Sequence, residues 1–173
     1  MSRPQSNDYA AYYARYIDKV KADSLQQAIQ TYSGEMLNFY NSLPEAKADY
    51  RYAEGKWTIK ELFLHVIDAD RIFAYRALRI ARNDQTPLPG FDENAYVPQS
   101  FAGERSLWSL KDEFTAVRRA TDLLLLSFNE EQLARQGTAS NQPVTVNALG
   151  FIIYGHLLHH KSILEERYLS DAR

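Results

Sequence analysis

Four long stretches of this chain repeat apolar residues every three or four positions, and this period constrains the fold more than any other feature of the sequence. A helix with that spacing has one apolar side, whereas a half-buried strand alternates every two residues. No stretch shows sustained two-residue alternation with hairpin turns. The pattern therefore predicts an all-α chain with four main helices.

The positions of these helices follow from start and stop signals. Ser24 with Gln27, and Thr58 with Glu61, have the spacing of a capping box, in which each side chain accepts a backbone N–H of the other residue. Pro44 ends the first helix, because proline cannot continue the helical hydrogen-bond ladder. The helices are expected at 24–42, 58–82, 106–128 and from 145 or 147 to 168, and a shorter helical segment is compatible with 8–19.

The segment 83–105, between the second and third helices, contains three prolines and two glycines. It is too long and too broken for a tight connection, which predicts a long crossover between helices 2 and 3. Loops of this length are often functional lids. Its acidic and aromatic residues have two interpretations, closure over a site or an ordinary surface turn. These residues are Phe91, Asp92, Glu93 and Tyr96. A polar stretch, 129–142, connects the third and fourth helices.

The composition limits the domain count and the partners. A chain of 173 residues, 45% of them hydrophobic, has the size and apolar content of a single domain over 1–173. Its 20 basic and 22 acidic residues give a net charge of -2, without the basic excess that nucleic acids attract. Residues 1–10 lack the features of a secretory signal, and no apolar run approaches the roughly 20 residues that span a bilayer. We therefore expect a cytoplasmic protein that binds neither nucleic acid nor membrane.

The chain has no cysteine, so histidines and carboxylates are its only plausible strong metal ligands. One of its four histidines, His65, lies in the second predicted helix, and three lie in the fourth. Residues four apart on a helix point the same way, which places His156 and His160 together in the middle of the apolar stripe. His159 lies at the edge of this stripe, where an interface, a supporting hydrogen bond and solvent are all compatible with it.

A lone histidine on an apolar face is more often a hydrogen-bonded core residue than a ligand. Two adjacent imidazoles each need a partner, however, and one divalent cation satisfies both. His65 would supply the third ligand, from a helix face that it shares with Leu62 and Phe73. Three histidines without a fourth protein ligand leave a coordination position for water or substrate, as in catalytic zinc sites. Imidazole suits zinc, nickel, copper or iron, and we favour zinc or nickel.

Two carboxylates lie near His65 in the sequence. Asp68, three residues later, is about 60° from His65 around the helix, which makes it the candidate for a hydrogen-bond acceptor that orients a ligand or for a general base. Glu61 is one turn earlier, but its position in the capping box indicates a structural role.

A basic series on the second helix also has two interpretations. A solvated face with ion pairs is favoured over an anion site, although binding of a substrate carboxylate or of the acidic groups of a thiol cofactor stays open. The series consists of Arg71, Arg76, Arg79 and Arg82.

Two segments resemble the DinB/YfiT-like superfamily. In 52–65, a Trp57-Thr58 helix start is followed by His65, and 154–160 ends in the HxxHH pattern formed by His156, His159 and His160. With the helix order and the crossover, the resemblance covers nearly the whole chain. It implies a metal-binding four-helix bundle, often a homodimer, with His65, His156 and His160 as ligands. Members of this superfamily include metal-dependent hydrolases and thiol-dependent S-transferases or isomerases, and many members have no known activity.

Three hypotheses follow, in order of preference. The first is a metal-dependent enzyme, a hydrolase or a transferase using a low-molecular-weight thiol, that acts on a small molecule and has a cavity beside the metal. The second is a non-catalytic stress-response or sensor protein with a closed, fully coordinated metal site. The third is a structural bundle without metal, whose histidines are hydrogen-bonded in the core.

Overall fold

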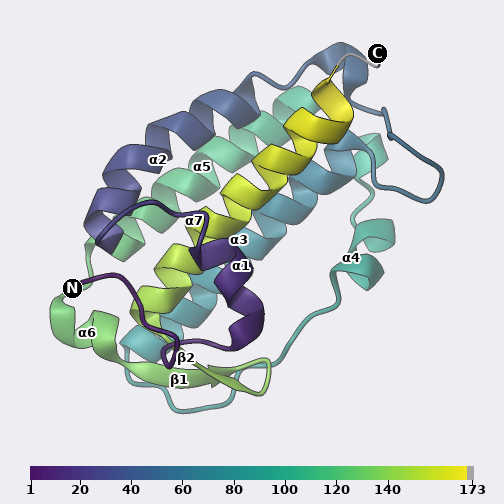
Figure 1. The fold of residues 1–173 in the computed structure, drawn as a ribbon. Helices are drawn as coiled ribbons and strands as arrows, with labels where there is room; N and C mark the ends of the chain where they lie inside the picture. Colours follow the sequence, from purple (N-terminus) through teal and green to yellow (C-terminus); the bar gives the residue numbers. More distant parts are fainter. Residues whose placement is uncertain (171–173) are drawn as a thin grey trace.

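The structure, a computed structural model, describes residues 1–170. Its four long helices are α2 (Leu25–Asn41), α3 (Ile59–Ala81), α5 (Leu107–Leu126) and α7 (Val146–Ile163), and they lie together as a bundle (Figure 1). This architecture confirms the predicted all-α class, the four-helix bundle and the long crossover between the second and third long helices. None of the helices within the described residues combines the length and apolarity needed to cross a membrane.

The predicted capping residues begin the helices. The Ser24 side chain accepts a backbone N–H in the first turn of α2. Thr58 and Glu61 form the complete capping box at the start of α3, with both reciprocal hydrogen bonds present. Ser106 and Thr145 cap α5 and α7 in the same way, with one side-chain acceptor each. These bonds satisfy backbone donors that would otherwise lack a partner at each helix start.

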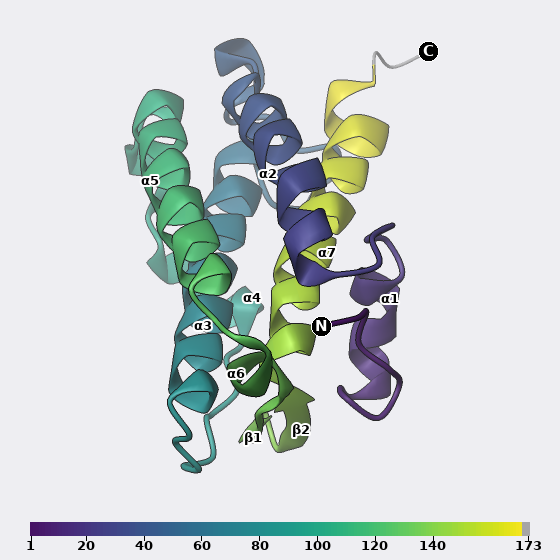
Figure 2. The same cartoon turned by 90° about the vertical axis from the view of Figure 1, so that its left-hand side faces the viewer.

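The helix directions explain the long crossover. Helix α3 packs between α5 and α7, and α2 packs against the same two helices on the other side. The helices α2 and α7 run in one direction, and α3 and α5 run in the other (Figures 1 and 2). Because α3 and α5 are parallel neighbours, the chain must return along the whole bundle between them. The 23 residues of α3 correspond to a length of about 34 Å.

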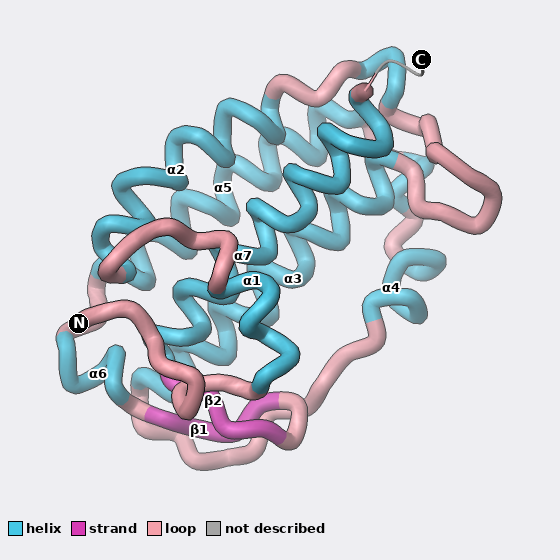
Figure 3. The backbone as a smooth tube through the Cα atoms, viewed as in Figure 1, coloured by secondary structure: helices cyan, strands magenta, loops and turns pink. Residues whose placement is uncertain are grey.

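The crossover contains regular structure and is not extended along its whole length. It begins at a small β-hairpin and then follows the outside of the bundle to α4 (Glu93–Gln99) (Figure 3). The Leu88 backbone fixes its beginning, because Leu88 N donates to Thr138 O at 2.9 Å and Leu88 O accepts from Ser140 N at 3.0 Å. Asp92 caps α4 with its side chain.

The connection between α5 and α7 differs from the prediction. The sequence indicates a polar stretch without strands, whereas the structure has α6 (Glu130–Ala134) and an antiparallel hairpin of β1 (Gln136–Ala139) and β2 (Gln142–Thr145). Strands of four residues are too short to show a clear alternation. The turn residues Ser140 and Asn141 have φ values of 52° and 61°, the left-handed conformation that tight hairpin turns require.

The N-terminal segment packs on α7. It forms a short helix, α1 (Ala14–Ile17), which lies beside α7 (Figure 2). The approach is closest at Gly155, where an added Cβ would lie 2.2 Å from the carbonyl oxygen of Tyr16. Only glycine allows the two backbones to come this close. The contact places α1 directly over the turn of α7 that carries His156.

A buried network of charged and hydroxyl groups joins the four long helices. Arg118 of α5 is fully buried and forms ion pairs with Asp70 of α3 and Asp122 of α5. Asp122 also accepts hydrogen bonds from Ser33 of α2 and Tyr154 of α7. Burial alone would lower the pKa of the Arg118 guanidinium, but the neighbouring carboxylates outweigh burial and raise it. The charge of Arg118 is therefore held in the core by two carboxylates.

Candidate metal centre

The structure brings together the three histidines that the sequence singles out as metal ligands. His65 extends from α3, and His156 and His160 extend from successive turns of α7, which packs antiparallel to α3. The Nε2 atom of His156 lies 3.2 Å from Nε2 of His65 and 3.1 Å from Nε2 of His160. One ring nitrogen from each residue lies within 4.8 Å of the other two, and all three side chains are buried.

This arrangement fits a divalent ion better than it fits hydrogen bonding among the rings. A neutral ring nitrogen has one proton or one lone pair, so Nε2 of His156 cannot bond well to two other Nε2 atoms at once. Nitrogen ligands at 2.0–2.1 Å from a tetrahedral zinc ion lie about 3.3 Å apart, close to the separations found here. His160 Nδ1 is buried without a hydrogen-bond partner among the described residues. No side chain in that set therefore fixes the orientation of the His160 ring through Nδ1.

Burial keeps the three imidazoles neutral. Desolvation lowers the pKa of His65 to about 4, although nearby Glu93 acts in the opposite direction. Burial and the neighbouring histidines hold the pKa values of His156 and His160 well below the usual value. Neutral imidazole is the form that binds a metal ion, so the site is ready for a cation at neutral pH.

The same pKa shifts predict how the metal-free protein responds to acid. Below pH 6.5, the usual pKa of histidine, the unfolded chain binds protons that the folded chain excludes until the pH reaches about 4. The free energy of unfolding should therefore decrease as the pH is lowered from 6.5 toward 4, by up to about 1.4 kcal/mol per pH unit for each buried histidine. Urea unfolding at a series of pH values measures this slope, and a flat profile from pH 6.5 to 4.5 would contradict it.

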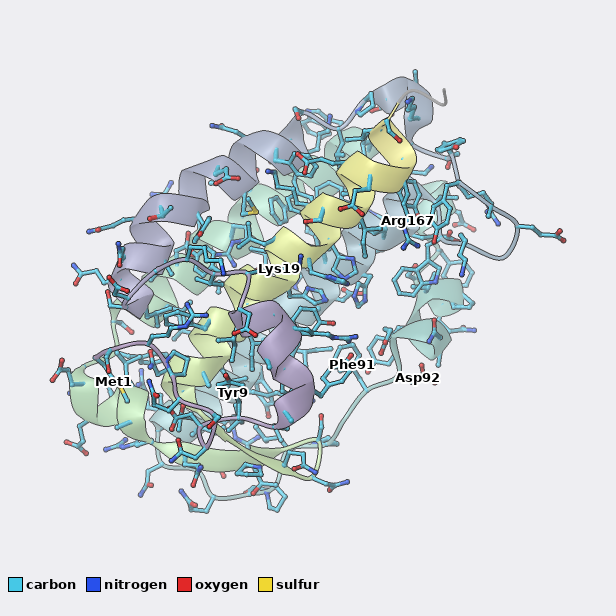
Figure 4. All side chains as sticks on the ribbon, in the orientation of Figure 1. Met1, Tyr9, Lys19, Phe91, Asp92 and Arg167 are labelled. Atoms are coloured by element: carbon cyan, nitrogen blue, oxygen red, sulfur yellow. The ribbon has the colours of Figure 1, made fainter. Side chains whose placement is uncertain are left out.

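A cavity of about 440 Å³ opens beside the three histidines. Its walls come from the N-terminal segment, α3, α7, the crossover and the β-hairpin. Figure 4 shows Phe91, on the crossover, near α1, and both segments contribute side chains to the cavity wall. The residues that line it besides the three histidines are Ala10, Tyr12, Tyr13, Arg15, Tyr16, Trp57, Phe73, Arg76, Phe91, Glu93, Ser140, Gln142 and His159. The site thus has the open side that a substrate would need.

The structure places Asp68 behind His65 rather than in this cavity. Asp68 lines a separate space of about 10 Å³ that it shares with His65, Phe91 and Tyr96. Burial raises its pKa, and the closest cationic group is Arg71, at 4.0 Å. A role for Asp68 in catalysis stays a prediction.

His159 lies at the wall of the large cavity. It is half-buried, its ring centroid is 5.1 Å from that of His160, and the ring of Tyr16 is 5.3 Å away. It is not one of the three residues whose ring nitrogens converge. Its place at the cavity wall would allow contact with a bound molecule, a role that the sequence did not suggest.

Sequence reasoning missed several residues of the cavity. The tyrosines at 12, 13 and 16 belong to a segment whose packing has no signal in the sequence. Glu93 belongs to the crossover, and its place on the cavity wall favours the lid interpretation of that segment. The interpretation of the basic series as a solvated face is wrong for Arg76, which is 2% exposed, although Arg71 and Arg79 do form the expected ion pairs.

Comparisons with known proteins agree with this fold. A family model described as the DinB superfamily matches residues 28–164. A protein of Oceanobacillus iheyensis, provisionally named a metal-dependent hydrolase, is 32% identical over 72 residues. This match spans 41% of the present chain and 41% of that protein, so less than half of the relative is covered.

Two solved structures share the fold. YfiT from Bacillus subtilis, described as a probable metal-dependent hydrolase with an unusual four-helix bundle topology, has a TM-score of 0.65 at 16% identity, over 95% of this chain and 91% of that one. The mycothiol-dependent maleylpyruvate isomerase also has a TM-score of 0.65, at 12% identity, over 87% of this chain and 59% of that one. At these identities the likeness shows the fold alone. The family match over 28–164 shows that the chain belongs to the DinB superfamily.

Proposed function

We propose that this chain is a metal-dependent hydrolase of a small molecule, with one divalent ion, zinc or nickel, held by His65, His156 and His160. The observation that carries this proposal is the convergence of three buried ring nitrogens at the wall of a cavity of about 440 Å³. The provisional name of the Oceanobacillus iheyensis relative supports the same chemistry. When bound, the metal supplies a Lewis acid that polarises a carbonyl group or lowers the pKa of water toward neutrality.

The residues around the histidines suit this role. The rings of Trp57 and Phe73 lie 5.0 Å from His65 and 5.8 Å from His156, so apolar groups shield the ligands from bulk water. The carboxylate of Glu93, which also lines the cavity, could accept a proton from the reacting water. Asp68 is proposed as a positioning residue that acts through His65, because it lies behind that ring and outside the large cavity.

Substitution of the two carboxylates separates these roles. Glu93→Gln should lower kcat by about 100-fold or more at neutral pH, because general-base catalysis contributes roughly 10²–10⁴-fold. Asp68→Asn should reduce metal affinity by about 10–100-fold and change kcat less once metal is saturating. Steady-state kinetics with added metal, combined with metal titration, give both quantities. A larger loss of kcat in Asp68→Asn than in Glu93→Gln would reverse the assignment.

Thiol-dependent transfer is the second candidate. One structural neighbour is a mycothiol-dependent isomerase, and the open cavity has space for a thiol beside the histidines. A metal lowers the pKa of a coordinated thiol as it does that of water. The open cavity also favours an enzyme over a sensor, since a sensor without turnover needs no substrate space beside its metal.

The test is a reaction screen on the purified protein after its metal content has been measured by elemental analysis. Small esters and amides are offered alone, and electrophiles are offered with several small thiols, before and after chelation. Turnover of an ester or amide that stops on chelation and returns with zinc or nickel supports the hydrolase. Turnover that requires a thiol favours the transferase. Protein without bound metal, which binds none when zinc or nickel is added, would refute both.

A further inference from the structure

A second buried arginine, Arg76 of α3, has no acidic partner. Its residue exposure is 2%, and its Nη2 atom donates to Pro89 O at 2.7 Å and to Ser140 Oγ at 3.1 Å. Within residues 1–170, no carboxylate oxygen lies within 4.0 Å of its guanidinium. Among the described residues, the guanidinium of Arg76 thus contacts neutral groups, two oxygen acceptors and two aromatic rings, and no anion.

Arg76 differs from Arg118 in lacking a carboxylate partner. Arg118, equally buried, contacts two carboxylates, as a buried cation normally does. Removing a charge from water without an opposite charge costs several kcal/mol, so proteins rarely bury an arginine in this way without a function. A buried cation that lacks an anion in the protein is suited to an anion from outside.

Arg76 lines the cavity beside the histidines, and it also lines a second space of about 290 Å³ along the crossover. Its Nε and Nη1 atoms donate to no protein acceptor in the described part of the chain, although neither is sealed from solvent. The ring of Phe73 lies near both Arg76 and His156. Its centroid is 5.8 Å from Cζ of Arg76 and 5.8 Å from the His156 ring. The cation and the histidine centre are therefore separated by about one aromatic ring.

We propose that Arg76 binds a carboxylate of the substrate at the end of the cavity away from the histidines. The substrate class is a small monocarboxylate with an apolar body, which lies along Phe73 and Phe91 and presents its reacting group to His65, His156 and His160. The Phe91 ring lies 5.9 Å from Arg76 Cζ, so both rings flank the guanidinium. This assignment rests on the proposed hydrolase for the reacting end, whereas the anion site itself depends only on Arg76 and the cavity.

The other charges of the cavity favour a single negative charge. Glu93 on the same wall would repel a dianion such as a phosphate more strongly than a carboxylate. Arg15 is exposed, and its guanidinium lies over the rings of Tyr12 and Tyr16, so solvent screens its charge. Arg76 alone combines burial with unused donors.

The test compares ligands of similar size, with the same phenyl ring, on the full-length protein. Binding of phenylacetate, phenylacetamide and phenyl phosphate is measured by ligand-observed NMR and calorimetry. We expect phenylacetate to bind at least about tenfold more tightly than the neutral amide, since a charge-assisted hydrogen bond contributes about 1.5–3 kcal/mol. Equal binding of acid and amide would overturn the anion site, and tighter binding of phenyl phosphate would overturn the carboxylate assignment.

Variants of Arg76 and of a control arginine test where the carboxylate binds. Arg76→Gln should abolish the preference for the acid, and Arg76→Lys should retain part of it. Arg119→Gln, which removes an exposed arginine of α5 outside every cavity described above, should leave the preference unchanged. Retained binding of phenylacetamide by Arg76→Gln shows that the cavity is intact. A variant that loses the amide as well would indicate that Arg76 only anchors Pro89 and Ser140, and this outcome would overturn the proposal.

A His160→Ala variant separates this inference from the proposed function. If the carboxylate binds at Arg76, the preference for the acid persists in His160→Ala and is lost in Arg76→Gln. The opposite result, loss in His160→Ala and persistence in Arg76→Gln, would place the anion at the histidine centre and overturn the role of Arg76 while supporting a metal there. Protein that binds no zinc or nickel when either is added, and still prefers the acid through Arg76, would refute the metal proposal alone.

Discussion

His156→Ala is expected to reduce bound divalent metal from about one ion per chain to a trace, with affinity at least about 100-fold weaker. His156 is the central member of the cluster, because its Nε2 atom lies within 3.2 Å of Nε2 of both His65 and His160. Loss of a residue that merely supports a ligand typically reduces metal affinity 10–100-fold, so loss of a ligand should exceed this range. Elemental analysis and competition with a chromogenic chelator measure the effect.

His159→Ala is the matched control for this experiment. The residue is an imidazole of the same helix turn and lines the same cavity, but its ring nitrogens lie outside the converging set. It should retain about one metal ion per chain with affinity within a few-fold of the unaltered protein. Equal metal content in the His156→Ala and His159→Ala proteins would exclude His156 as a ligand.

Arg118→Met is expected to lower the free energy of unfolding by about 3–5 kcal/mol. The methionine fills a similar part of the core, but it leaves Asp70 and Asp122 buried at 3% and 8% exposure without a cation. Total stabilities of small domains are typically about 5–15 kcal/mol, so this loss would remove a large part of the stability. Urea unfolding followed by circular dichroism measures it.

The reason for the loss can be tested by removing the uncompensated charges. Asp70→Asn and Asp122→Asn, added to Arg118→Met, should recover at least half of the lost stability, because a neutral amide is far easier to bury than a carboxylate. If the triple variant is less stable than Arg118→Met alone, the lost free energy comes from packing or hydrogen bonding and not from charge.

The long helices could be predicted because their signals are local. Thr58 and Glu61 form the capping box that their spacing predicts, and the periodic apolar residues lie in the core. The β-hairpin could not be predicted, because its strands have only four residues each and depend on contacts with distant parts of the chain. Helix α1 lies within the short helical segment that the sequence allows at 8–19, but its packing on α7 has no signal in the sequence. The burial of Arg76 also depends on distant contacts, since its sequence neighbours do not reveal that the crossover and the hairpin cover it.

The candidate site could be predicted only in part. Helical spacing placed His156 and His160 together, and His65 was the one histidine left on another apolar face. The cavity walls depend on the fold, so the contribution of Tyr16 had no signal in the sequence, whereas Glu93 was a candidate as part of a possible lid. Metal binding, the single domain, a cytoplasmic location, a homodimer and the lack of nucleic-acid binding stay predictions.

The sequence separation between the histidines of α3 and α7 has a consequence for folding. His65 and His156 are 91 positions apart in the sequence, and they meet only after α7 has docked against α3. Closing so long a loop carries an entropic cost that local helix formation does not. The cluster is therefore incomplete until α7 has docked, and a cation that binds all three histidines should stabilise the finished bundle rather than direct its assembly.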